Sequence, residues 1–277
     1  IMIKFIRNIL KEILLEPFLL RRLTIKIIKY LNLGRYDARL HYSATKRPQY
    51  GYCVYQAARL AKKLGYKKIS VLEFGVAGGR GLLILEEHAH EISKLFDIDI
   101  EIYGFDSGNG LPAPTNYKDM PYIWKKGFFK MDYDKLVNKL NQAKLIIGEI
   151  NDTIESFFTE YNPAPVGAII HDFDYYSSTS VALKMFNHQD KYFLPRIFCY
   201  FDDTIGNSTS LFNDYTGERL AINEFNINEA NIKITKPYYF INYTHTEDWH
   251  HQIWIIHLFI HRDYNTYISF ENKQLKI

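Results

Sequence analysis

Several protein classes leave marks that this sequence lacks. Its only two cysteines, Cys53 and Cys199, lie far apart and outside any Cys-x-x-Cys pattern, which argues against a disulfide framework or a cysteine zinc site. No apolar run reaches the roughly 18 residues of a membrane span, and the first residues show no signal-peptide cleavage pattern. The net charge is only +3, without a basic run. We therefore predict a cytoplasmic protein with no nucleic-acid partner.

Residues 3–33 differ from the rest of the chain. Apolar residues there alternate with seven basic and only two acidic residues, and Pro17 is expected to break the segment into two helices. Such a basic amphipathic pair can lie on an anionic membrane or pack on the main domain or a second subunit. Packing is favoured, because most amphipathic helices bury their apolar face. We predict an N-terminal helical extension over residues 1–49, with peripheral membrane contact and a homo-oligomer as alternatives.

From residue 65 onward, short apolar runs alternate with helical patterns, which is typical of a parallel sheet covered by helices. The predicted strands are 69–74, 100–105, 145–148, 167–171 and 197–201. The predicted helices are 81–95, 133–141, 153–161 and 178–190. These units predict an α/β domain with an open, doubly wound sheet over residues 50–277.

The rhythm changes after the fifth strand. A predicted helix, 217–226, is followed by extended segments 232–241 and 252–261 with no helix between them. Two strands so connected are antiparallel, so we expect a hairpin at the sheet edge. Proline and glycine gather in residues 107–121, where we expect a long loop over the ligand pocket.

A glycine-rich turn follows the first predicted strand. Gly75, Gly78 and Gly79 stand where backbone amides can approach a ligand closely, although a merely tight connection is the alternative. Their spacing, G-x-x-G-G-x-G, does not match the dinucleotide fingerprint. Asp106 ends the second strand beside this turn, where a carboxylate can accept both ribose hydroxyls of a nucleoside. The sequence therefore predicts a nucleoside site at this edge.

Four segments together carry a family resemblance. They are residues 73–76 with the glycine turn, 104–106, 172–179 and 202–203. They resemble the macrocin-O-methyltransferase-like (TylF-like) group of class I methyltransferases, over residues 50–264. This resemblance implies a Rossmann-like sheet, five parallel strands plus an antiparallel C-terminal hairpin, and S-adenosyl-L-methionine as the methyl donor. It also implies donor-binding roles for a set of residues: Glu73 near the methionine end, Glu149 near the adenine, and Gly75, Gly78, Gly79, Asp106, Ser107 and Asp172.

Four more acids follow the fourth and fifth strands. Asp172, Asp174, Asp202 and Asp203 are expected to share a small volume, where like charges raise each other's pKa unless a cation intervenes. Mg²⁺ is the economical cation, and we predict Asp172, Asp202 and Asp203 as its ligands. The division between Asp172 and Asp174 stays open, because Phe173 departs from a strict Asp-Gly-Asp. Both acids could alternatively cap the next helix.

A metal held there could lower the pKa of a substrate hydroxyl, preferably one of a vicinal pair, and orient it. Asp174 or His171 is the candidate base, although His171 could equally be a core histidine. Five aromatic residues could line the acceptor pocket: Tyr117, Tyr122, Trp124, Tyr175 and Tyr176.

The resemblance implies an O-methyltransferase acting on a hydroxyl of a sugar or a glycosylated small molecule. One alternative is an NAD(P)-dependent oxidoreductase, although the glycine spacing differs and no Tyr-x-x-x-Lys pair follows in the right region. A second is a non-catalytic, membrane-peripheral scaffold. Such a scaffold would have lost its catalytic residues, and the acids retained at the strand ends argue against that loss.

Overall fold

The strands form one seven-stranded sheet, in which they lie side by side in the order β3-β2-β1-β4-β5-β7-β6. This computed structural model describes residues 10, 18–243 and 246–269. The strands are β1 (Lys68–Phe74), β2 (Asp99–Asp106), β3 (Lys144–Ile147), β4 (Val166–His171), β5 (Phe193–Phe201), β6 (Ile232–Thr235) and β7 (Ile253–Leu258). Strands β1 to β5 pair in parallel, and β7 is antiparallel to both β5 and β6. The predicted fold class is confirmed.

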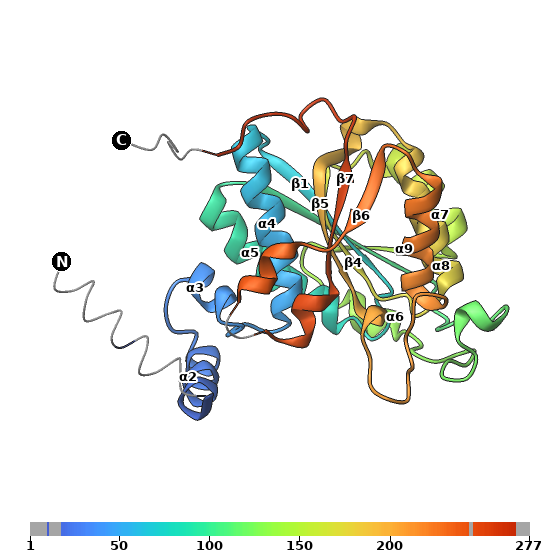
Figure 1. Ribbon diagram of the computed structural model, residues 1–277, viewed down its shortest axis with the longest axis horizontal. Helices are drawn as coiled ribbons and strands as arrows, with labels where there is room; N and C mark the ends of the chain where they lie inside the picture. The colour runs from blue at the N-terminus through green and yellow to red at the C-terminus, as the bar shows by residue number, and fades with distance from the viewer. Residues whose placement is uncertain (1–9, 11–17, 244–245, 270–277) are drawn as a thin grey trace.

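Helices cover both faces of this sheet (Figure 1). On one face lie α4 (Pro48–Leu64) and α5 (Arg80–Phe96), and on the other α7 (Ile150–Tyr161), α8 (Tyr176–Ala182) and α9 (Gly217–Asn228). Shorter helices are α3 (Tyr36–His41) and α6 (Tyr133–Val137). This layering leaves the carboxyl ends of the parallel strands open between the two helix layers, where α/β sheets bind ligands.

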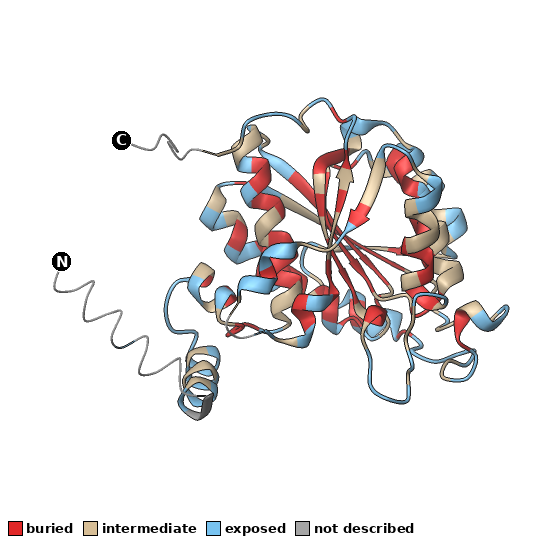
Figure 2. Cartoon of the chain, in the orientation of Figure 1, coloured by how far each residue is buried: buried red, intermediate tan, exposed pale blue. Residues whose placement is uncertain are grey.

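The pleat of β1 shows how one strand supplies two cores. Ile69 and Val71 pack with α4 and α5, whereas Leu72 and Phe74 pack with the helices of the opposite face. Successive side chains of a strand point to opposite faces, so a strand covered on both sides must be apolar nearly throughout. Figure 2 shows the buried residues following the strands. A buried sheet of this kind holds the strand ends in fixed positions.

Several predicted boundaries differ from the structure. The extended segment 232–241 ends as a strand at Thr235, because Pro237 has no amide hydrogen for the ladder, and a 3-10 helix follows. The predicted helix 178–190 ends at Ala182 and passes into 3-10 turns, and the predicted helix 133–141 ends at Val137. Helix α4 was not predicted, although Pro48 in its first turn and Gly65 at its end are typical helix boundaries.

The N-terminal extension is described only in part. Helix α2 (Phe18–Leu31) exposes Leu23, Ile27 and Tyr30, while the first predicted helix and its break at Pro17 lie outside the described residues. Tyr36 of α3 is buried in the main core. The boundary between residues 49 and 50, and contact of the extension with a membrane or second subunit, stay predictions. No helix in the described ranges is both long and apolar enough to cross a membrane.

Candidate functional site

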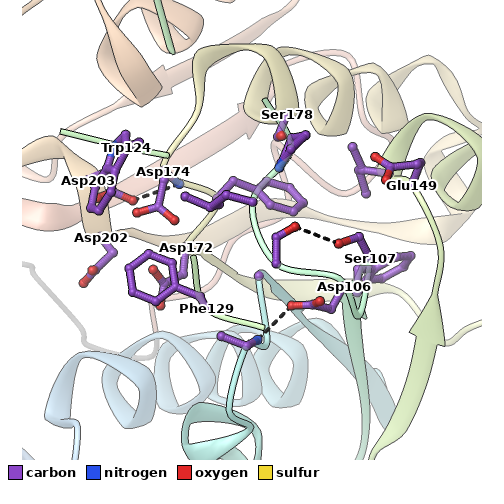
Figure 3. Close-up of a pocket in the computed structure, with 18 of the residues that line it drawn as sticks. Asp106, Ser107, Trp124, Phe129, Glu149, Asp172, Asp174, Ser178, Asp202 and Asp203 are labelled. Atoms are coloured by element: carbon purple, nitrogen blue, oxygen red, sulfur yellow. Dashed lines mark hydrogen bonds between the residues drawn. The ribbon is translucent and has the colours of Figure 1, made fainter. Parts of the chain in front are cut away.

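A cavity of about 350 Å³ opens at the carboxyl ends of the parallel strands. Such a volume lies within the ordinary range for small-molecule sites. Figure 3 shows its acids in two groups, one around Asp106 and Glu149 and the other around Asp172 and Asp202. Eight residues predicted to bind the donor or the metal or to act as the base line it: Gly75, Asp106, Ser107, Glu149, Asp172, Asp174, Asp202 and Asp203.

Asp106 is held by two backbone amides. Its Oδ2 accepts a hydrogen bond from the Ala77 amide at 2.8 Å, and its Oδ1 accepts one from the Gly108 amide at 2.6 Å (Figure 3 draws the first). A carboxylate oxygen has about two acceptor positions, so each oxygen keeps one for a ligand. The carboxylate is therefore fixed at the glycine turn and still able to accept the two hydroxyls of a ribose.

Gly75 makes the closest approach between two strand ends. Its φ is +82°, and a Cβ there would lie 1.8 Å from the backbone oxygen of Asp172, so no other residue fits without moving the strands. Gly78 and Gly79 do not line the cavity. Gly79 adopts a left-handed conformation where α5 begins. Of the three predicted glycines, the structure brings only Gly75 to the ligand space.

Glu73 lies behind the cavity wall. It is 1% exposed and accepts a hydrogen bond from the Tyr50 hydroxyl at 3.2 Å, on the side of the sheet covered by α4 and α5. Burial raises the pKa of Glu73 to about 8, although the charge of Arg47 and the Tyr50 hydrogen bond oppose the rise. Glu73 does not line the cavity, but its charge contributes to the raised pKa of Asp172, which does.

Three carboxylates converge at the other end. Oxygens of Asp172, Asp202 and Asp203 all lie within 4.8 Å of one another. Burial, and then the charges of neighbouring aspartates, raise the pKa of Asp172 and of Asp203 well above the ordinary range. A bound cation would remove that repulsion, and three carboxylate oxygens suit a hard ion such as Mg²⁺. The residues present fit the predicted metal.

The two candidate bases lie in different surroundings. Asp174 lines the cavity, and burial followed by the charges of Asp172 and Asp202 raises its pKa to about 8. His171 is fully buried, stacks on Phe201 at 4.0 Å between ring centroids, and does not line the cavity. Burial lowers the pKa of His171 to about 3. His171 is thus placed as a core histidine, and the structure leaves Asp174 as the candidate base.

Two charged residues near the acids were not predicted as site residues. Glu218 is fully buried on α9, where its Oε2 accepts a hydrogen bond from the Asp203 amide at 3.0 Å. It therefore fixes the backbone that carries Asp203. Arg47 lines the cavity just before α4. The local hint in the sequence was Pro48, because proline often stands in the first turn of a helix, and Arg47 directly precedes it.

Of the five predicted acceptor-pocket aromatics, Trp124 lines the cavity, where its ring lies 5.8 Å from that of Phe129. Tyr175 is buried and donates to the backbone oxygen of Pro112 at 3.1 Å. The other three are Tyr117, Tyr122 and Tyr176, and they do not line the cavity either. The aromatic wall of the cavity, Trp124 and Phe129, thus comes from the segment that directly follows the predicted loop 107–121.

Comparison with known proteins identifies the fold. Neither models of protein families nor curated protein sequences give a match. Among solved structures, CalS11, a calicheamicin methyltransferase, superposes with a TM-score of 0.50 at 15% identity, covering 84% of this chain and 90% of that one. This chain has the class I methyltransferase fold. The O-methyltransferase NovP superposes with a TM-score of 0.49 at 13% identity, covering 76% of this chain and 79% of that one.

Proposed function

We propose that this class I methyltransferase-fold chain is an S-adenosyl-L-methionine-dependent O-methyltransferase, assisted by a divalent metal. The observation that carries the proposal is one cavity with two chemically distinct ends. A nucleoside-accepting carboxylate, Asp106, lies at one end, and the metal-type cluster of Asp172, Asp202 and Asp203 lies at the other. A methyl donor and a metal-bound hydroxyl need these two subsites side by side.

Several polar residues of the cavity then have parts in the reaction. Asp106 accepts the ribose hydroxyls, while Ser107 and Glu149 border the adenine side. When bound, the donor supplies a methyl group on a positively charged sulfur, and the metal acidifies the acceptor hydroxyl. Asp174 receives the hydroxyl proton on its carboxylate, for which a pKa near neutrality is suitable.

The acceptor is proposed to be a hydroxyl of a sugar or glycosylated small molecule. The family resemblance of residues 172–179 supports it, and so does the cavity wall, which combines the rings of Trp124 and Phe129 with carboxylates. Aromatic rings pack on the apolar face of a sugar while carboxylates accept its hydroxyl hydrogens. A small-molecule partner fits the cavity volume of about 350 Å³.

The test has two stages. Calorimetry first compares S-adenosylhomocysteine with NADH; micromolar binding of the former alone is expected, and preference for NADH would favour an oxidoreductase. A screen of deoxy- and amino-sugars and their nucleotide-linked forms, with Mg²⁺ and labelled donor, then follows methyl transfer. Donor binding with no transfer to any hydroxyl, with or without Mg²⁺, would contradict the O-methyltransferase assignment.

A further inference from the structure

Arg47 is a fixed cation at the edge of the cavity. Its guanidinium donates a hydrogen bond to the Tyr50 hydroxyl and lies 4.9 Å from the centre of the Tyr50 ring. Tyr50 is itself fully buried and donates to Glu73 at 3.2 Å. An arginine held by stacking and by a hydrogen bond has lost much of its freedom before a ligand arrives, so less entropy is lost on binding.

Arg47 also stands out by charge. Among the described residues that line the cavity it is the single lysine or arginine, against six acids. Burial alone would lower the pKa of Arg47, but Tyr50 and the charges of Asp172 and Glu73 outweigh it and raise the pKa. The guanidinium therefore stays charged, and among the described residues that line the cavity it is the cationic side chain that an anionic group can bind.

We infer that Arg47 binds the α-carboxylate of the methyl donor's methionine moiety. This inference rests on the proposed function, which places the donor's ribose at Asp106. Asp172 and Arg47 line the same cavity; the main chain at Asp172 lies against the Gly75 turn, and the charges of Asp172 and Arg47 interact. The amino-acid end of the donor carries one ammonium and one carboxylate. The acids suit the ammonium, and the planar fork of Arg47 suits the carboxylate.

The experiment separates the carboxylate from the rest of the donor. Calorimetry measures the affinity of wild type and Arg47→Gln for S-adenosylhomocysteine and for 5′-methylthioadenosine, which lacks the amino-acid end. Arg47→Gln should weaken S-adenosylhomocysteine binding by about 10- to 100-fold and leave 5′-methylthioadenosine binding unchanged. Lys46→Gln is the matched control, because Lys46 is exposed and pairs with Glu87 at 2.8 Å; it should change neither affinity.

Unchanged binding of 5′-methylthioadenosine also shows that the variant is folded. An equal loss for both ligands would overturn the inference, because Arg47 would then only support the fold. Unchanged S-adenosylhomocysteine binding, with or without a raised KM for an anionic acceptor, would overturn it too. If the wild type bound neither ligand, the proposed function itself would fail, a result distinct from either of these.

Discussion

The two ends of the cavity differ in how much negative charge they gather around one carboxylate. At the donor end, Asp106 has two backbone amides as partners. At the proposed metal end, Asp203 also accepts a backbone amide, that of Asp174 at 3.0 Å, but Asp172, Asp202 and Asp203 lie close together, and burial with mutual repulsion raises the pKa of Asp172 and Asp203. The donor end is therefore organised by the chain alone. At the proposed metal end, a bound cation would offset the repulsion among the aspartates.

The largest effect is expected from Asp203→Asn, which keeps the shape of the side chain but removes one charge from the metal end. Turnover should fall on the order of 100-fold or more, because a metal contributes several kcal/mol to the transition state. Donor affinity should be unchanged. Steady-state kinetics with calorimetry measures both, and Asp190→Asn, at an exposed position outside the cavity, is the control. Full activity of Asp203→Asn in chelator would show that no metal acts here.

The next largest effect is expected at the donor end. Asp106→Ala removes an acceptor of charge-assisted hydrogen bonds, so the affinity for S-adenosylhomocysteine should fall by roughly 1.5–3 kcal/mol, or about 10- to 150-fold. Calorimetry checks this, with Asp106→Asn as the variant that keeps the shape. Mg²⁺ dependence of the remaining turnover should not change. Wild-type affinity in Asp106→Ala would refute the ribose role and remove the distinction between the two ends.

The pH dependence of stability should reveal the metal end directly. The pKa of Asp174 lies at about 8 in the folded chain, above its ordinary value of 3.8. Folding therefore favours the protonated form, and this stabilisation is complete below about pH 4 and is lost as the pH rises through about 8. The melting temperature in chelator should fall over that range, and Mg²⁺ should restore it at the alkaline end.

Asp174→Asn is the control for this pH effect. It cannot ionise, so its melting temperature should depend less on pH than that of the wild type. A wild type whose stability is independent of pH, and of Mg²⁺ at the alkaline end, would show that the aspartates do not repel one another in solution.

The smallest effect is expected at the aromatic wall between the two ends. Trp124→Ala should raise the acceptor KM by about 3- to 10-fold, since an aromatic contact contributes roughly 0.5–1.5 kcal/mol beyond its area. Trp124→Phe should lose less, and donor affinity should stay unchanged in both. Kinetics with varied acceptor checks this. A fall in donor affinity would instead place Trp124 at the donor end.

The parts predicted from the sequence share a physical origin. Apolar runs in strands covered on both faces are conspicuous, and parallel strands deliver their terminal residues to one edge. The pattern of residues therefore suffices to place Asp106, Asp172 and Asp202 together. The direction in which a side chain points at a strand end is harder to predict from the sequence. Glu73, one residue before the end of β1, and His171, the last residue of β4, lie at neighbouring strand ends as well, yet the pleat turns both side chains into the core.

Contacts between segments that lie far apart in the sequence could not be predicted from the pattern of residues. Arg47 reaches the cavity only because α4 packs along β4 and β5, and no local spacing reveals such a packing. Glu218 supports Asp203 from 15 residues further along the chain. Its buried carboxyl has no signature of its own, because acids on helices are usually exposed.

The contact at Gly75 has a consequence for how acceptor preference can change. Since the main chain of the glycine turn meets the main chain at Asp172 with no room for a Cβ, the separation between the glycine turn and the acids that follow β4 is set by backbone rather than by side chains. Residues of the overlying loop, such as Trp124 and Phe129, are free of that constraint. In the proposed enzyme, substitutions in that loop could therefore change the acceptor while the distance between the two strand ends stays the same.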